Sequence, residues 1–343
     1  MRWPSSRACK QLMTTTSDHH IAIWGVGALG SLFAGYLSTV AQVTMVGRWP
    51  EQIAAVQRDG LTIHRADGRA SRFFPAITDN PAALPPIDLV LVLVKSHQTA
   101  GIAPAIARAL SPNGVAITLQ NGVGNLEVLA QAVGVERATQ GVTAQGANFV
   151  GLGAVRHAGA GLTHMAVLPE RAGLIETVIA LLNRSGIETH ATHAADSLVW
   201  GKLAVNAGLN PLTALLDLPN GELVTEPQRQ SFMIAAAREV EAVAAAQGIP
   251  LPYPDVAAQV QEVARVTGAN ISSMLQDVRR QVPTEIDAIC GAVVRYGARL
   301  HVPTPVNALL FDLIRAKERG QGIAPEAVYR ALSQVTPRPG RAD

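Results

Sequence analysis

A glycine-rich turn between a short strand and a helix is the feature that most constrains the fold. Residues 21–24 are apolar, Gly25-Val-Gly27-Ala-Leu-Gly30 follows them directly, and an amphipathic helix is predicted up to Leu37. A strand predicted over 42–46 completes a βαβ unit. The three glycines permit a tight turn, a close approach of phosphate to backbone, and close helix–strand packing. The motif therefore predicts a dinucleotide site at the helix N-terminus, lined by Gly25, Val26, Gly27, Ala28, Leu29 and Gly30.

The order of the predicted elements divides the chain into two halves. Residues 87–94 are almost continuously β-branched or leucine, which predicts a central parallel strand covered on both faces. Further strands are predicted at 115–119, 137–147, 149–157, 161–168 and 186–190, with helices at 125–133 and 171–183. After Asp196 only helices are predicted, at 195–216, 227–247, 254–280, 285–300 and 306–318. The expected fold class is an α/β N-terminal Rossmann-type domain followed by an all-α C-terminal domain.

The expected domain bounds follow from these patterns. Residues 1–19 are expected to be a disordered extension, with Met13 as an alternative start, and 20–193 the Rossmann-type domain. The helical domain is expected at 194–325 and a tail at 326–343.

Composition excludes several classes of protein. The net charge is only +2 and like charges do not cluster, which argues against nucleic acid and anionic membranes as partners. Cys9 and Cys290 are far apart and lack metal-ligand spacing, so neither a disulfide framework nor a metal site is predicted. With no apolar run of about 20 residues, no membrane span is expected. We expect a cytoplasmic protein.

Three side chains follow predicted strands where cofactors bind in open α/β sheets. Arg48 stands where an NAD-specific site would carry an acidic residue, and a guanidinium binds a 2′-phosphate well, so NADPH is favoured over NADH. Lys95 and Asn121 follow the next two strands and are candidates for cofactor contact, Asn121 for substrate contact as well. The alternative for Arg48 and Lys95 is a solvated surface side chain.

The first long helix of the second half carries a polar seam. Lys202, Asn206 and Asn210 are spaced four residues apart among apolar neighbours, so they share one helix face. A buried ammonium is costly without a partner, which favours a ligand cleft beside Lys202. The alternative is that Lys202 reaches solvent and the asparagines cap nearby loops.

Two later segments combine polar residues with helix starts. Thr284 is a candidate N-cap with Asp287 reaching back to it, and Glu285 would then only complement the helix dipole. Ser272 and Ser273 are also explained by helix capping. Periodicity alone leaves these structural explanations open.

Taken together, the motifs resemble the ketopantoate reductase (2-dehydropantoate 2-reductase) family. The similar blocks are residues 25–30, 120–124, 200–206, 210–214, 219–223, 270–277 and 284–287, within a resemblance covering about 20 to 320. The sequence departs from the family at Gln120, where many relatives have His, and at Ser96 and His97.

The resemblance implies an enzyme that reduces ketopantoate to pantoate with NADPH in pantothenate biosynthesis. It implies that Lys202 is the general acid, and that Glu285 is catalytic, contacts the substrate hydroxyl and lies near the nicotinamide. Ala147 would line the cofactor by its backbone. The implied substrate contacts are Asn121, Lys202, Asn206, Asn210, Asn220, Asn270, Ile271, Ser272 and Ser273.

Other functions remain open at this point. A related reductase of another small 2-keto acid would share the fold and the general acid. A non-catalytic NADPH sensor would share only the Rossmann half and would need neither Lys202 nor Glu285. Whether the protein forms a homodimer is undecided by the sequence.

Overall fold

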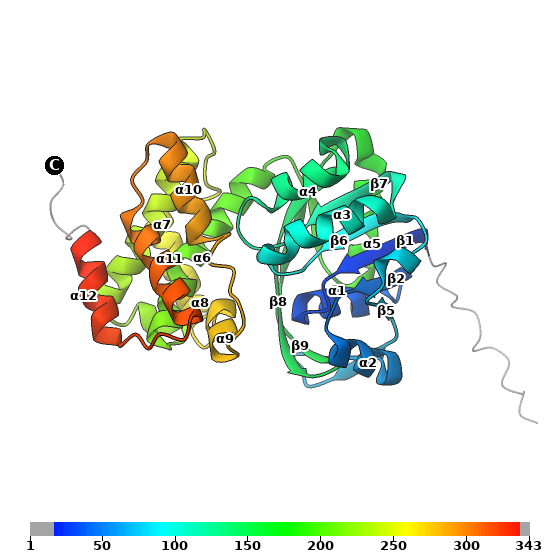
Figure 1. Cartoon of the computed structure of the whole chain (residues 1–343), viewed down its shortest axis with the longest axis horizontal. Coiled ribbons are helices and arrows are strands. Elements are labelled where there is room, and N and C mark those ends of the chain that lie inside the picture. Colours follow the sequence, from blue (N-terminus) through cyan, green and yellow to red (C-terminus); the bar gives the residue numbers. More distant parts are fainter. Residues whose placement is uncertain (1–16, 337–343) are drawn as a thin grey trace, which may run out of the picture.

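The computed structural model describes residues 17–336 as two halves lying side by side, one a sheet flanked by helices and the other made of helices alone (Figure 1). Most of the extension predicted at 1–19 lies outside the described residues. Its last part does not match the prediction, because β1 (Ser17–Trp24) already pairs with β2 (Ala41–Val46) at Ser17. The polar residues there gave no strand pattern, and backbone pairing with β2 supplies the order instead.

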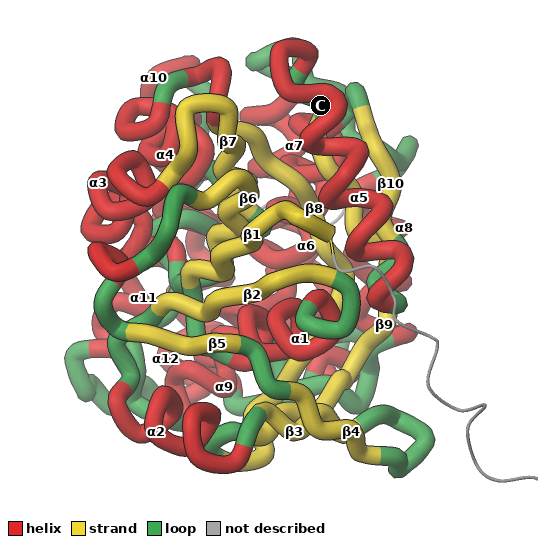
Figure 2. Tube along the Cα trace, turned by 90° about the vertical axis from the view of Figure 1, so that its right-hand side faces the viewer, coloured by secondary structure: helices red, strands yellow, loops and turns green. Residues whose placement is uncertain are grey.

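A parallel sheet forms the centre of the first half. Its neighbouring strands are β7 (Leu110–Thr118), β6 (Ile87–Val92), β1, β2 and β5 (Ala76–Thr78), as Figure 2 shows. The central position predicted for residues 87–94 is confirmed, since β6 lies between β7 and β1. Polar side chains at the carboxyl ends of these strands therefore meet at one edge.

Helices cover both faces of this sheet. Ile21 and Ile23 point to the face covered by α1 (Ala28–Leu37) and α5 (Ala172–Ser185). Ala22 and Trp24 point to the opposite face, covered by α3 (Thr99–Ala109) and α4 (Asn125–Val133). This alternation explains why the strands are apolar at nearly every position. The helix α2 (Pro50–Asp59) follows β2.

Two long strands replace the shorter strands predicted beyond Arg137. β8 (Ala138–Gly151) pairs with β7 at its start and is antiparallel to β9 (Ala154–Ala166) along the rest. Small residues at which the sequence predicted strand ends lie instead inside continuous strands. The pairing of these strands has irregularities in register, including one between Thr143 and Gln145. The sheet continues through β3 (Leu61–His64) to β4 (Ala70–Phe73), and β10 (Thr189–Thr192) pairs with β9.

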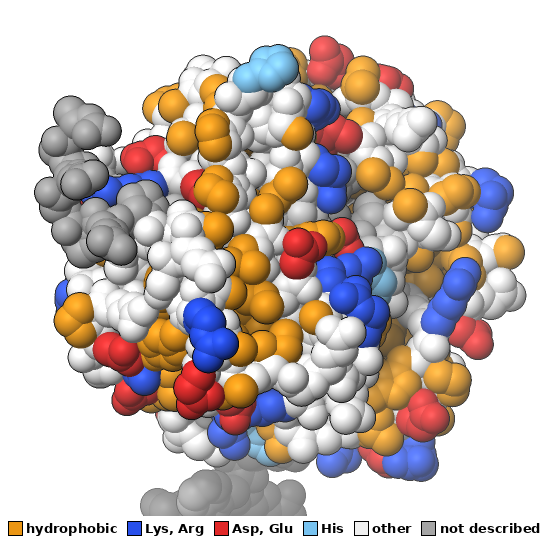
Figure 3. Space-filling model, turned by 60° about the vertical axis from the view of Figure 1, so that its left-hand side comes forward, with side chains coloured by type: hydrophobic (Ala, Val, Ile, Leu, Met, Phe, Trp, Pro, Cys, Tyr) orange, Lys and Arg blue, Asp and Glu red, His pale blue; other side chains and the backbone are white. Residues whose placement is uncertain are grey.

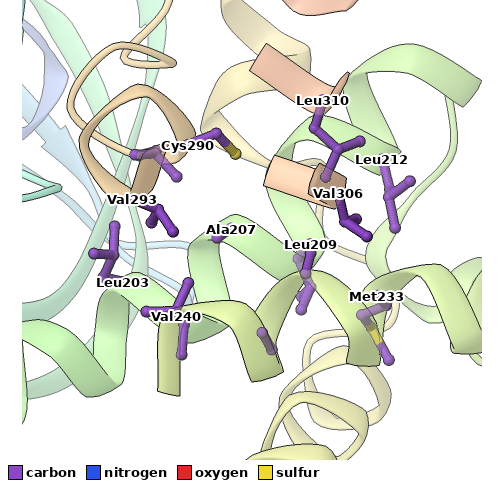
Figure 4. Packing of buried hydrophobic residues seen from close by; sticks show 14 of the residues in the cluster. Leu203, Ala207, Leu209, Leu212, Met233, Val240, Cys290, Val293, Val306 and Leu310 are labelled. Atoms are coloured by element: carbon purple, nitrogen blue, oxygen red, sulfur yellow. The ribbon is translucent and has the colours of Figure 1, made fainter. Parts of the chain in front are cut away.

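The second half is a cluster of helices around α6 (Ala195–Leu216). Leu203, Ala207 and Leu209 of α6 pack in the core against Val240 of α7 and Val293 of α10 (Figure 4). The surrounding helices are α7 (Pro227–Ala245), α8 (Val256–Val266), α9 (Ser273–Arg279), α10 (Cys290–Leu300), α11 (Pro305–Glu318) and α12 (Pro325–Val335). Cys290 is a buried free thiol in this core.

Three predictions for this half were wrong in detail. The single helix expected at 254–280 is two helices, because the chain turns at Gly268 and Ser272 starts a new cap. The helix expected at 285–300 begins only at Cys290. Part of the expected tail is α12, whose Val328 and Leu332 are fully buried, so burial of this apolar pair orders a segment that was assigned no structure.

The described surface carries charges of both signs. Figure 3 shows acidic and basic side chains interspersed on one face, next to apolar patches. Among the described residues, no helix has the length and apolar character needed to cross a bilayer.

Candidate active site

The three fingerprint glycines have the geometry that a bound pyrophosphate requires. Gly25 adopts φ +134° and donates its N–H to Val46 O at 2.9 Å. A Cβ on Gly30 would lie 2.0 Å from Gly25 O, so only glycine lets the helix pack here. A Cβ on Gly27 would meet nothing within 4 Å, which leaves open space at the start of α1. These residues fit a dinucleotide with its phosphates at the unpaired amides of α1.

The other expected cofactor residues surround this loop. Val26 is buried, while Ala28, Leu29 and Ala147 are partly buried against the same apolar cluster. Arg48 lies two residues beyond the end of β2, is exposed, and has no ion pair or hydrogen bond within residues 17–336. Its guanidinium is therefore available to an anionic ligand.

Lys95 connects the two halves at the carboxyl edge of the sheet. Its Nζ donates to Asp277 Oδ2 at 2.6 Å and lies 3.8 Å from Glu285 Oε2. The Asp277 side chain is only 2% exposed, and Arg280 Nη2 donates to its other oxygen at 2.8 Å. Lys95 thus forms a hydrogen-bonded ion pair with Asp277 and lies near the second buried carboxylate, Glu285, a contact that its position after β6 alone did not predict.

Glu285 points from the helical half toward the ends of β6 and β7. It is 6% exposed and accepts hydrogen bonds from Asn121 Nδ2 at 3.0 Å and from Ser96 N at 3.3 Å. The structure therefore brings together three predicted site residues, Asn121, Glu285 and Lys95. A buried carboxylate held by donors on one side keeps its remaining acceptor capacity for a ligand hydroxyl.

The loop that carries Asn121 is held by contacts with the sheet half and with the helical half. Gln120 Nε2 donates to Val94 O at 2.9 Å and to Thr99 Oγ1 at 2.8 Å. At Gly122 the backbone has φ +82° and a Cβ would lie only 2.2 Å from Ala288 O. Gln120, the residue at which the sequence departs from many relatives, therefore holds the loop by hydrogen bonds within the protein.

Lys202 projects from α6 toward β8. Its Nζ donates to Thr143 O at 2.7 Å, where the β8–β9 register is interrupted. Burial lowers the pKa of the Lys202 ammonium to about 8, and the negative charge of Glu285 opposes that fall. No ion pair joins Lys202 to Glu285, so the two opposite charges influence each other without neutralising each other. An ammonium in this state can donate both a hydrogen bond and a proton near neutral pH.

The asparagines of the predicted seam keep unused hydrogen-bonding groups. Within the described part of the chain, the side-chain amides of Asn206 and Asn210 make no hydrogen bond, although Asn210 is 8% exposed. Asn220 Nδ2 donates to Thr267 Oγ1 at 2.8 Å, whereas its buried Oδ1 has no partner. A buried acceptor without a partner, such as Asn220 Oδ1, is costly, and a polar ligand would satisfy it.

The segment 270–273 divides into ligand-accessible and structural residues. Asn270 and Ser273 are exposed and Ile271 is partly buried. Ser272 differs: its Oγ accepts from Leu275 N at 3.1 Å and from Thr213 Oγ1 at 2.7 Å. It caps α9, as the structural alternative proposed, so its expected substrate contact has no support from this geometry.

The cap predicted at Thr284 is only partly observed. Thr284 Oγ1 accepts from Ile286 N at 3.2 Å, as a capping side chain does, but the helix begins only at Cys290. Asp287 forms ion pairs with Arg295 and Arg315 instead of reaching back. Glu318, at the end of α11, accepts from the Thr284 N–H at 2.8 Å. Glu285 lies five residues before the start of α10, and the dipole of a helix acts mainly within its first turn, so this geometry gives the helix-dipole alternative for Glu285 no support.

Two family models match this chain. The model described as "Ketopantoate reductase PanE/ApbA" matches residues 21–170, and "Ketopantoate reductase PanE/ApbA C terminal" matches residues 195–318. The chain belongs to the ketopantoate reductase family. Members of this family named 2-dehydropantoate 2-reductase include a protein of Halobacterium salinarum, 35% identical over 87% of this chain and 99% of its own length. Another, from Archaeoglobus fulgidus, is 33% identical over 88% and 98%.

Solved structures show the same ketopantoate reductase architecture. A PanE/ApbA family ketopantoate reductase from Ralstonia eutropha aligns with a TM-score of 0.81 at 30% identity, covering 88% of this chain and 99% of that one. A D-mandelate dehydrogenase solved with NADH and anilino(oxo)acetate aligns with a TM-score of 0.82 at 26% identity and the same coverage. The Rossmann-type domain followed by a helical domain is thus the architecture of this oxidoreductase family.

Several residues of the site escaped the sequence analysis. Asp277 lies in a family-like block but received no role, because its ion pair with Lys95 spans 182 positions. Thr143 and Ser96 contact Lys202 and Glu285 through a backbone carbonyl and a backbone N–H. A pattern of side-chain types cannot predict such contacts. Glu318 lies on a regular helix and gave no signal.

Proposed function

We propose that this ketopantoate reductase family member reduces ketopantoate to pantoate with NADPH. The proposal rests on one observation: Lys202, which is partly buried, and Glu285, which is buried, carry opposite charges and converge on the carboxyl edge of the sheet without forming an ion pair. A keto oxygen needs a cation and a proton donor, and a substrate hydroxyl needs an acceptor. The cytoplasm is the compartment that we expect for this reaction.

The chain's own residues would divide the chemistry as follows. Bound NADPH would supply the hydride. Lys202 would donate a hydrogen bond to the keto oxygen and stabilise the negative charge that develops there, then transfer its proton to that oxygen. Thr143 O holds the amine during this step by its 2.7 Å hydrogen bond. Glu285 would accept a hydrogen bond from the substrate hydroxyl and so orient the keto carbon.

The amides of the helical half would recognise the rest of the substrate. Asn206 and Asn210 have free donors for a carboxylate, and Asn220 has a buried free acceptor for a hydroxyl. Ser273 and Asn270 are exposed beside them. Satisfying buried groups with the correct ligand gives stronger selectivity than apolar contact does.

Kinetics with two matched substrates test this proposal. Ketopantoate and 3,3-dimethyl-2-oxobutanoate differ only in the hydroxyl, and NADPH oxidation is followed at 340 nm. We expect the hydroxyl to raise kcat/KM by about a hundredfold or more, with most of that ratio lost in Glu285→Gln. Lys202→Ala should lower kcat with both substrates. Equal use of the two substrates by the wild type would contradict the assignment of ketopantoate.

NADPH preference is proposed from Arg48 and tested separately. Its exposed, unpaired guanidinium follows β2, where the adenosine ribose lies in Rossmann-type domains. Arg48→Ala should raise KM for NADPH by about tenfold and leave KM for NADH nearly unchanged, because only NADPH carries the 2′-phosphate. A parallel increase for both cofactors would show that Arg48 does not read that phosphate.

Reduction of a bulkier 2-keto acid is the second candidate function. The likeness to a D-mandelate dehydrogenase favours it, since that enzyme shares the fold. Phenylglyoxylate, the keto acid that corresponds to mandelate, is the test substrate. A kcat/KM for phenylglyoxylate above that for ketopantoate would select this candidate.

A further inference from the structure

The segment that carries Glu285 is anchored to a helix far along the chain. Glu318, at the end of α11, accepts two hydrogen bonds on one oxygen, from Thr284 N at 2.8 Å and from Thr284 Oγ1 at 2.7 Å. Thr284 is 4% exposed and the Glu318 side chain is 13% exposed. Thr284 is the residue immediately before Glu285, so the anchor lies one peptide unit from the site.

The Thr284 hydroxyl also fixes the backbone on the other side of Glu285. Its oxygen accepts from Ile286 N at 3.2 Å while its proton is donated to Glu318. One hydroxyl therefore restrains the residues before and after Glu285 at the same time. Arg315 Nη1 holds the second oxygen of Glu318 at 2.9 Å, which fixes the carboxylate plane.

Glu285 makes its own side-chain contacts only with the other half of the molecule, at Asn121, Ser96 and Lys95. Within the helical half its position depends on the backbone at 284–286. We propose that Glu318 is a positioning residue that acts through Thr284 to set the carboxylate of Glu285 relative to Lys202. The proposal rests on the proposed function, in which those two groups bind the substrate's hydroxyl and keto oxygen.

The required accuracy makes such an anchor necessary. A displacement of about 1 Å at a reacting centre can lower a rate by about a hundredfold. The turn that Glu285 opens is held on its C-terminal side, where Glu285 O accepts from Ala288 N and Ile289 N, both at 3.1 Å. A side chain at a site is held firmly only when the residues around it are fixed as well. The Glu318 anchor adds two charge-assisted hydrogen bonds from α11 on the N-terminal side of Glu285, at Thr284.

Four variants test the anchor. Glu318→Ala removes both acceptors and Thr284→Val removes only the hydroxyl, whereas Glu318→Gln keeps one oxygen that can accept both bonds. Glu239→Ala is the matched control, because Glu239 accepts from Val306 N and Asn307 N, both at 2.8 Å, and so anchors the opposite end of the same helix. Its loss should lower Tm without changing kcat below the unfolding transition.

We expect Glu318→Ala to lower kcat for ketopantoate by tenfold to about a hundredfold, with Thr284→Val less affected and Glu318→Gln close to wild type. Combined with Glu285→Gln, Glu318→Ala should cause no further loss, because two changes that act through one group are not additive. An additive loss, or an equal loss in the Glu239→Ala control, would overturn the proposal and leave Glu318 as a stabilising residue.

A measurement on the enzyme without substrate tests the positioning role of Glu318 independently of the proposed function. The pKa of Lys202 is measured by competitive acetylation across pH, with the four lysines of the chain resolved by mass spectrometry. Since the charge of Glu285 raises the pKa of Lys202, moving it away in Glu318→Ala should lower that pKa, as Glu285→Gln does. An unchanged pKa would refute the positioning role. A lowered pKa in a protein that reduces no ketopantoate would retain it and reject the substrate.

Discussion

The pH dependence of turnover follows from the burial of one amine. Burial lowers the pKa of Lys202 to about 8, with the charge of Glu285 acting in the opposite direction. The active form is the protonated acid, so activity should be highest below that pKa and lost as pH rises through it. With a pKa near 8, about nine tenths of the amine is protonated at pH 7 and about one tenth at pH 9.

The assay is kcat/KM for the keto acid at saturating NADPH, from pH 6.5 to 10. We expect a plateau below pH 7.5 and a loss of about tenfold for each pH unit above 8.5. Glu285→Gln should move the fall to lower pH, because the charge that raises the pKa of Lys202 is gone. Lys202→Arg provides the control, since a guanidinium does not titrate in this range.

Two results would refute this reasoning. Activity that stays level to pH 10 would mean that Lys202 is not the acid, or that its environment does not lower its pKa. The same fall in Lys202→Arg would assign the titration to another group.

Three further predictions concern stability, and two of them compare a pair of variants. Asp277→Asn should lower the free energy of unfolding by about 1–2 kcal/mol in urea titrations at pH 7, because it removes a buried charge shared by two partly exposed cations; an unchanged midpoint would contradict that role. Gln281 is exposed with φ +55°, so Gln281→Gly should raise Tm. Gln276→Gly inside α9 should instead lower the free energy of unfolding by more than the cost of glycine in a helix, about 1 kcal/mol, because it also removes hydrogen bonds to Asn148 Oδ1 and Ile271 O. Gly122→Ala should cost far more stability than Gly124→Ala: both glycines have positive φ, but only a Cβ at Gly122 meets the facing carbonyl, at 2.2 Å, and equal losses would rule out that contact.

Much of the fold was predictable because its causes are local. The glycine turn, its flanking strand and α1 depend on neighbouring residues, and they appear in the structure where the pattern places them. The helix α6 has the predicted bounds, since its apolar and polar residues repeat with helical period. The convergence of Lys95 and Asn121 followed from a general property, that the carboxyl ends of parallel strands meet at one edge.

Other elements could not be predicted from neighbouring residues, because contacts with distant parts of the chain stabilise them. The long strands β8 and β9 contain glycines that look like breaks, and only their mutual pairing keeps them extended. The helix α12 was not predicted, because burial of Val328 and Leu332 against distant helices is what orders it.

The sequence by itself predicted candidate site residues in both the Rossmann-type and the helical parts of the chain. The tertiary structure decided how they meet. The ion pair of Lys95 with Asp277 and the hold of Glu318 on Thr284 join residues 182 and 34 positions apart. A local pattern cannot encode such pairs, since the direction in which each side chain points depends on how whole helices pack against the sheet.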